Sequence, residues 1–128
     1  MDREQLERGL KIRREVLGDE YVDRALNNVD DFNSDFQDIL NDYCWGGTWG
    51  RGVLSKQQRS ILNLGMLAAL GRSQEFGLHF RGAINNGLTQ EELKEVLIQI
   101  AVYCGIPAGV ESFRIARGVL EEMKAEKA

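Results

Sequence analysis

Apolar residues recur at helical intervals through most of this chain, and no segment shows the alternation of a β-strand. The spacing is clearest in SDFQDILNDYCW, where apolar residues stand at i, i+3, i+4 and i+7: Phe36, Ile39, Leu40 and Tyr43. The pattern predicts helices over residues 2–17, 19–28, 34–45, 55–70, 73–86, 89–104 and 107–124. The glycine-rich stretch GGTWGRGVL is not expected to form a regular element. We therefore predict an all-α protein of about six to seven helices in a single domain, residues 1–128.

Residues that begin and end helices punctuate the second half of the chain. SKQQ at 55–58 and TQEE at 89–92 have the form of capping boxes, a hydroxyl followed three residues later by Gln or Glu. Glycines stand where helices are expected to end: Gly71, Gly87 and Gly105. Pro107 suits the first turn of the helix that follows.

Two of the predicted helices carry more apolar surface than a small single-chain bundle can cover. The segments ILNLGMLAAL and VLIQIAVYC are hydrophobic nearly all round, which is typical of helices buried on more than one side. Small residues in the first segment would allow another helix to approach closely: Gly65, Ala68 and Ala69. We therefore expect a homo-oligomer.

Composition and charge exclude several functional classes. The net charge of −4 argues against binding of nucleic acid or anionic membranes, which require clustered positive charge. Cys44 and Cys104 are sixty positions apart and, with one histidine in the chain, make no plausible metal site. They could form a disulfide, but we expect two free thiols in a reducing cytoplasm. The N-terminal segment lacks the apolar region of a signal peptide and no run is long enough to span a membrane, which predicts a cytoplasmic protein.

The single histidine is the first candidate for catalysis. His79 follows Glu75 by four positions, which places the two side chains next to each other on a helix. A histidine–carboxylate pair can move protons near neutral pH. The alternative is a structural histidine whose neighbouring glutamate is an ordinary helix pair. Gly82, on the same side of the helix, would leave space over the ring.

Other candidates are consistent with substrate binding or with structure. An arginine could hold a substrate carboxylate or pair with an internal acid, and a tryptophan could wall a pocket or anchor a loop. The residues concerned are Arg59, Arg72, Trp45 and Trp49. Arg81 is expected to be a solvated surface charge, and Arg114 and Arg117 are expected to pair with acidic residues such as Glu121.

Four segments together resemble the carboxymuconolactone decarboxylase family. They are RREVLGDEYVDRALNN, YCWGGTWGRGVLSKQQRSILNLGMLAALGR, LHFRGAINNGLTQEELKEVLIQIAVYCGIPAG and SFRIARGVL. The resemblance runs from about residue 13 to 120. It implies the all-helical fold of the alkylhydroperoxidase D-like proteins, assembled into ring-shaped homo-oligomers, commonly hexamers. His79 matches the family histidine, whereas Arg72 and Glu75 stand where peroxidase relatives carry C-x-x-C, so disulfide-based peroxidase chemistry is not expected.

The resemblance also implies a reaction. It is the decarboxylation of 4-carboxymuconolactone, a lactone dicarboxylate, to 3-oxoadipate enol-lactone in the protocatechuate branch of the β-ketoadipate pathway. The substrate accepts the electrons released by CO2, so no cofactor or metal is expected. His79 and Glu75 would serve proton delivery, while Arg59, Arg72, Trp45 and Trp49 would bind substrate. The alternatives are a related enzyme acting on another lactone or keto acid, and a non-catalytic helical oligomer that serves as a binding module.

Overall fold

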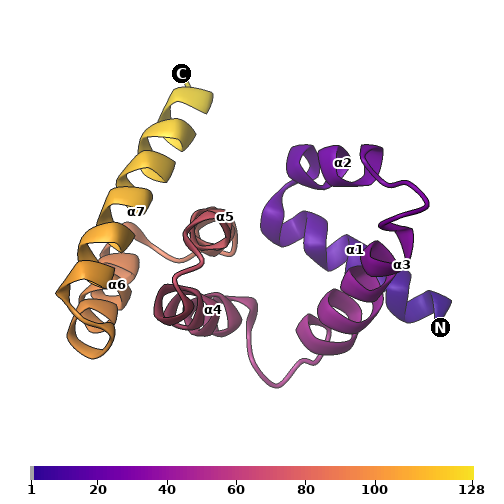
Figure 1. Cartoon of the computed structure of the whole chain (residues 1–128), viewed down its shortest axis with the longest axis horizontal. Helices are drawn as coiled ribbons and strands as arrows, with labels where there is room; N and C mark the ends of the chain where they lie inside the picture. Colours follow the sequence, from indigo (N-terminus) through magenta and orange to yellow (C-terminus); the bar gives the residue numbers. More distant parts are fainter. Residues whose placement is uncertain (1) are drawn as a thin grey trace. The chain divides into compact units, whose positions relative to one another are not determined.

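The computed structural model describes residues 2–128, and within that range the chain is all-helical without a β-strand. The elements are α1 (Arg3–Leu17), α2 (Asp19–Asn27), α3 (Ser34–Ile39), the π-helix η1 (Leu40–Trp49), α4 (Lys56–Leu70), α5 (Ser73–Asn85), α6 (Gln90–Cys104) and α7 (Ile106–Glu126). Figure 1 shows them in chain order from indigo to yellow. The predicted all-α class and number of helices are confirmed. The helices form two compact units, residues 1–56 and 57–128, and the single-domain organisation stays a prediction.

In the first unit, α1 lies close against η1 because glycines remove the side chains at the contact. A Cβ on Gly9 would stand 1.7 Å from the carbonyl oxygen of Asn41, and one on Gly46 would stand 2.2 Å from that of Gln5. The Gln5 side chain closes the contact by donating through Nε2 to the backbone oxygen of Asp42, at 3.1 Å, and to its Oδ1, at 3.0 Å. The packing of α1 on η1 is therefore specified at backbone level.

The sequence-based boundaries fail in this same region. An α-helix over residues 34–45 followed by an irregular stretch was expected, but α3 ends at Ile39 and a π-helix continues through the glycines to Trp49. A π-helix has i→i+5 hydrogen bonds and is rare, so apolar spacing does not announce it. Contact with α1 stabilises the glycine-containing turns that local propensity disfavours.

The second unit has its core among α4, α5, α6 and α7. The buried apolar residues are Leu64, Phe76, Phe80, Ala83, Leu88, Leu93, Leu97, Ile100 and Ala116. The Thr89 capping box is present, with Thr89 accepting from the backbone of Glu92 and Glu92 accepting from that of Thr89. The three glycines predicted at helix ends have positive φ: Gly71, Gly87 and Gly105. Pro107 lies in the first turn of α7, as expected. The SKQQ capping box stays a prediction.

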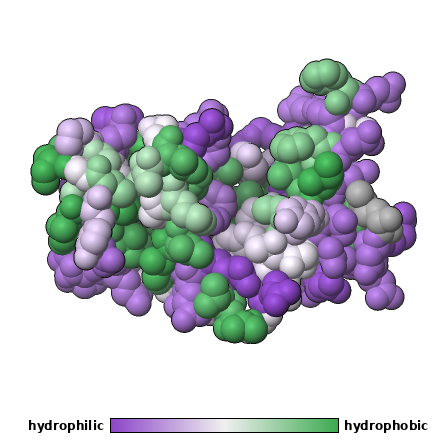
Figure 2. All heavy atoms as spheres, turned by 60° about the horizontal axis from the view of Figure 1, so that its bottom comes forward, coloured by the Kyte–Doolittle hydropathy of each residue, from purple (hydrophilic) through white to green (hydrophobic). Residues whose placement is uncertain are grey.

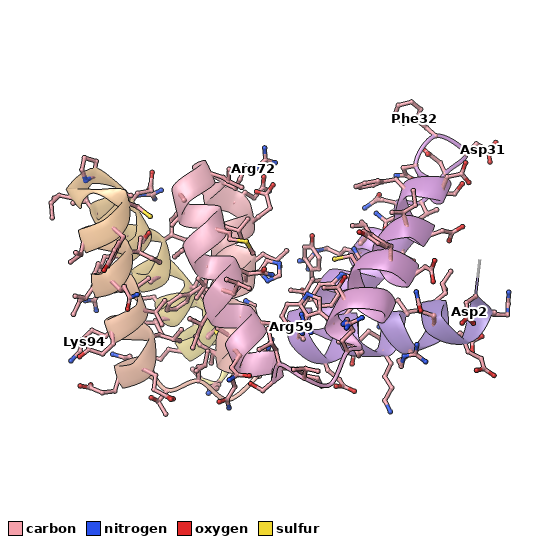
Figure 3. All side chains as sticks on the ribbon, turned by 90° about the horizontal axis from the view of Figure 1, so that it is seen from below. Asp2, Asp31, Phe32, Arg59, Arg72 and Lys94 are labelled. Carbon is pink, nitrogen blue, oxygen red and sulfur yellow. The ribbon has the colours of Figure 1, made fainter. Side chains whose placement is uncertain are left out.

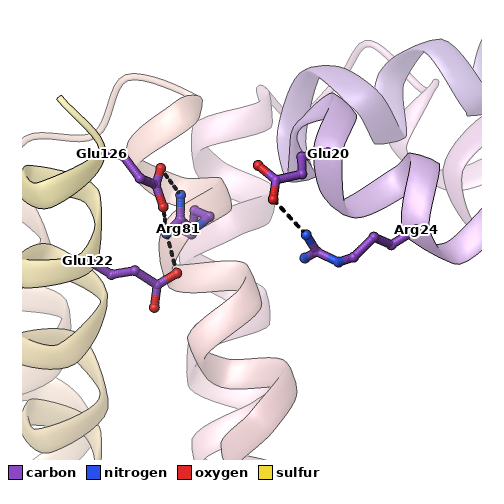
Figure 4. Close-up of polar contacts among 5 residues, drawn as sticks. All are labelled: Glu20, Arg24, Arg81, Glu122 and Glu126. Carbon is purple, nitrogen blue, oxygen red and sulfur yellow. Dashed lines mark hydrogen bonds and ion pairs between the residues drawn. The ribbon is translucent and has the colours of Figure 1, made fainter.

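Of the expectations about surface arginines, the one for Arg81 is wrong and the one for Arg114 is confirmed. Arg81 is not solvated: its side chain is only 21% exposed and joins α5 to α7 through Glu122 and Glu126, as Figure 4 shows. The guanidinium lies between the helices because two acids one turn apart on α7 face it. Arg114 pairs, as expected, with an acidic residue of its own helix, which is Glu111, three residues before it.

Much apolar surface stays uncovered in the single chain. Several large apolar side chains of the second unit are exposed: Ile61, Leu62, Met66, Leu70, Ile98, Val102, Tyr103, Ile106, Val110 and Phe113. In Figure 2 apolar surface gathers at the left, where α6 and α7 lie. Gly65, expected to admit a neighbouring helix, has open space around its Cβ position. Within residues 2–128, no helix is long and apolar enough to cross a membrane.

Candidate functional site

His79 lies near the middle of α5 and its ring is largely withdrawn from water. The residue is partly exposed, but its Nδ1 atom is buried. Burial lowers the pKa of His79 below its ordinary value because it disfavours the charged imidazolium, and the negative charge of Glu75 opposes this in part. The surroundings of His79 therefore favour its neutral imidazole form.

Glu75 stands one turn before His79 and makes its hydrogen bond with a different residue. Nη2 of Arg72 donates to Oε1 of Glu75 at 2.6 Å. This bond is the largest cause that lowers the pKa of Glu75, so its carboxylate is ionised at neutral pH. Glu75 thus acts on His79 through its charge, while its oxygen is held by Arg72. The expected pair is in effect a row of three groups, Arg72, Glu75 and His79, along α5.

The two predicted arginines do not come together. Arg59 lies in the first turn of α4, and Arg72 lies just beyond the other end of that helix. Thirteen residues at 1.5 Å per residue separate them by roughly 20 Å along the helix. Figure 3 labels both, Arg72 at the top of the unit and Arg59 at the bottom. The two arginines are thus carried at opposite ends of α4.

Hydrogen bonds that were not predicted from the sequence join the start of α4 to the end of α5. They fix the position of α5, and with it of His79, along α4. Nδ2 of Asn86 donates to Oγ of the fully buried Ser60 at 2.9 Å, and Nε2 of Gln57 donates to the backbone oxygen of Asn86 at 3.1 Å. His79 is seven residues from Asn86 and seven from Arg72, or about 10 Å along α5 in each direction. The available signal was that Ser60 stands one turn before the apolar Leu64, on the same face of α4.

The tryptophans belong to the first unit. Trp45 and Trp49 are both buried in η1, and their rings stack with centroids 4.8 Å apart and planes at 29°. Offset stacking of this kind stabilises an aromatic pair beyond the area it buries. The two rings therefore form one rigid apolar block.

The first unit also buries an arginine that sequence analysis did not single out. Nη1 of Arg13 donates to Oε1 of Gln37 and to Oδ1 of Asn41, each at 3.0 Å. Burial lowers the pKa of Arg13, the largest cause acting on it. Arg13 stands among charged residues in KIRREVLG, as is usual on a solvent-exposed helix face, so the sequence did not indicate that it is buried.

Thiol and metal chemistry have few groups to use. Cys44 and Cys104 are both free, and burial raises the pKa of the Cys44 thiol. Among residues 2–128, no three His, Cys, Asp or Glu side chains lie close enough together to hold a metal ion. The titratable groups gathered on α5 can instead move a proton and bind a carboxylate.

Comparison with known proteins agrees with this chemistry. Residues 34–118 match the carboxymuconolactone decarboxylase family. A 4-carboxymuconolactone decarboxylase from Acinetobacter baylyi is 38% identical over 122 residues, which cover 95% of this chain and 91% of that protein. A nitrosuccinic acid decarboxylase from Metarhizium robertsii is 39% identical over 123 residues, 96% of this chain and 86% of that protein.

Proposed function

Because this chain belongs to the carboxymuconolactone decarboxylase family, we propose that it removes CO2 from 4-carboxymuconolactone to give 3-oxoadipate enol-lactone. The observation that carries the proposal is the similarity to a 4-carboxymuconolactone decarboxylase over nearly the full length of both chains. Both curated relatives described above are decarboxylases, so the enzyme class is carboxy-lyase. The protocatechuate branch of the β-ketoadipate pathway is the corresponding metabolic context.

The reaction requires little chemistry from the protein. When the carboxylate on the γ-carbon leaves as CO2, its bonding electrons move through the ring double bond onto the lactone carbonyl oxygen and form a dienolate. A proton then adds at the α-carbon. The conjugated lactone itself accepts the electrons, so the protein has to bind a dianion and deliver one proton.

We assign proton delivery to His79 and electrostatic support to Glu75. A neutral His79 must first take a proton from solvent, and the negative charge of a bound substrate favours this step by raising the histidine pKa. Glu75 acts in the same direction, because its charge already raises the pKa of His79. Arg59 or Arg72 binds a substrate carboxylate, and a role of Trp45 and Trp49 in substrate binding stays a prediction.

Nitrosuccinic acid is a second candidate substrate, because a relative of equal similarity is named for it. It is also a dicarboxylic acid, and its nitro group can accept the electrons released by CO2. A site that binds two carboxylates and protonates a stabilised carbanion would suit either acid. Both reactions would be decarboxylations. The group that accepts the electron pair left by CO2 is the conjugated lactone in one substrate and the nitro group in the other.

Incubation of the purified protein with each acid separates the candidates. Loss of the lactone's ultraviolet absorbance and release of CO2 are expected with 4-carboxymuconolactone. Turnover of nitrosuccinic acid alone would assign the second function, and turnover of neither would favour a binding module.

Treatment with a chelator, and the double change Cys44→Ala with Cys104→Ala, should each leave most of the activity. Loss of turnover with the chelator would show that the mechanism above is incomplete.

A further inference from the structure

A cavity of about 370 Å³ lies where the end of α4, the beginning of α5 and the beginning of α7 meet. Its apolar walls include Leu67, Phe76 and Pro107, and its polar lining residues are Arg72, Ser73, Glu111 and Ser112. The volume is sufficient for a small organic acid. His79 does not line this cavity, but Arg72 connects the cavity to Glu75, the neighbour of His79.

Ser112 is the most informative residue of the lining. It is only 3% exposed and lines the cavity. A serine hydroxyl has one O–H donor, whose direction can rotate to suit a partner. Ser112 therefore brings a hydroxyl to the cavity wall that can donate to a bound anion.

Two helix beginnings add positive potential. α5 and α7 both start at the cavity, and neither N-cap residue, Arg72 or Gly105, supplies a side-chain hydrogen bond to the first turn. The first backbone N–H groups of a helix have no partner within the helix and carry the positive end of its dipole. An anion in the cavity would meet both helix ends.

The charges around the cavity leave Arg72 as the available cation. Of its five N–H donors, the structure engages one, in the bond to Glu75. The one carboxylate of the lining, on Glu111, is already paired with Arg114. An incoming carboxylate would therefore find free donors on Arg72, with the nearby negative charge of Glu111 compensated.

We propose that this cavity binds the carboxylate of a small organic acid, with Arg72 and Ser112 as its side-chain donors. The inference deepens the proposed function by giving one substrate carboxylate a place, and it rests on that function only for the identity of the acid. A carboxylate bound to Arg72 shares the guanidinium with Glu75. Binding in the cavity thereby weakens the ion pair between Arg72 and Glu75. The negative charge of Glu75 is then less compensated and raises the pKa of His79 more strongly.

Titration of the full chain with succinate tests the proposal without turnover. Succinate should bind and shift the backbone amide resonances of Ser73, Ala108 and Ser112, whereas succinamide, its uncharged analogue, should not. Ser112→Ala should weaken binding about tenfold, the usual effect of losing a hydrogen bond to a charged group. Arg72→Gln should weaken it at least as much. Arg117→Gln, the same change at an exposed site on α7 outside this cavity, should leave the affinity unchanged.

Several outcomes would overturn the assignment. They are the absence of succinate binding at tens of millimolar, equal binding of succinate and succinamide, and unchanged affinity in both Ser112→Ala and Arg72→Gln. The two proposals fail separately, because binding is measured without a reaction. If the protein binds succinate but decarboxylates neither acid, the cavity site stands and the proposed function is rejected. If it decarboxylates the lactone normally but does not bind succinate, the proposed function stands and the cavity site is rejected.

Discussion

The chemistry proposed for this protein depends on a histidine whose surroundings favour the neutral form. Sequence spacing correctly placed Glu75 next to His79, and its charge does act on the ring. The spacing could not show that burial is the larger influence, nor that Arg72 holds the carboxylate. The burial of His79 depends on tertiary packing, and the bond from Arg72 depends on the conformation at the start of α5. A helical wheel contains neither kind of information.

Replacing the histidine tests its role directly. His79→Gln should lower kcat by about 10²–10⁴-fold, the usual effect of losing a positioned proton donor, while circular dichroism and assembly stay unchanged. Glu75→Gln should cost less, because the ring remains and loses only its supporting charge. In D2O the wild-type enzyme should place one deuterium at the α-carbon of the product. A folded His79→Gln protein with near-normal kcat would assign the histidine a structural role.

The dependence of kcat/KM on pH should carry the signature of the buried ring. If His79 delivers the proton as imidazolium, kcat/KM falls as pH rises through the pKa of the free enzyme, below the ordinary histidine value of about 6.5. Glu75→Gln removes the charge that raises this pKa, so the falling limb should move to still lower pH. A limb that stays in place in Glu75→Gln would contradict the proposed coupling.

Most helices were predictable because capping residues and glycines mark their ends. The ends of α4, α5, α6 and α7 lie within two residues of the expected positions. The π-helix η1 was not predictable, since contact of its glycines with α1 stabilises it rather than its own sequence. The same limit hid the Ser60–Asn86 bond, which joins residues 26 positions apart. Local signals predicted the elements, and long-range contacts determined the details of the site.

Two glycines on α7 should respond in opposite ways to the same substitution. A Cβ on Gly109 would lie 2.5 Å from that of Ala101 on α6, so Gly109→Ala should destabilise the protein by about 1–3 kcal/mol. Gly118 has nothing within 4 Å, so Gly118→Ala should stabilise the helix by roughly 0.5–1 kcal/mol. Urea unfolding measures both. Equal midpoints for the two variants would show that α6 and α7 do not approach as described.

Exposed apolar surface motivates the expected assembly. Within nine residues at the junction of α6 and α7, Val102, Tyr103, Ile106 and Val110 are 71%, 83%, 69% and 65% exposed. Large apolar side chains exposed close together in the sequence are typical of an interaction site, and these four residues are called the junction patch below. We propose that the junction patch is covered by further copies of the chain, in the ring-shaped and commonly hexameric arrangement that the family resemblance implies.

Light scattering at micromolar concentration should accordingly give several times the chain mass of 14.4 kDa. Val102→Glu places a charge within the junction patch and should shift the mass toward the monomer. Gln74→Glu adds the same charge at an exposed polar position of α5 and should not. A wild-type monomer would exclude the assembly, and a mass unaffected by Val102→Glu would place the interface elsewhere.

Different interactions hold the beginning and the end of α7 against the rest of its unit. Its last buried residue is Ala116, whereas its final turns are connected to α5 by the ion pairs of Arg81 with Glu122 and Glu126. Salt screens ion pairs and leaves apolar burial intact or stronger. Raised ionic strength should therefore let the backbone amides of residues 121–126 exchange with deuterium faster while those of residues 109–116 keep their protection. The C-terminal end is thus the part of this helix whose local opening depends on the ionic composition of its surroundings.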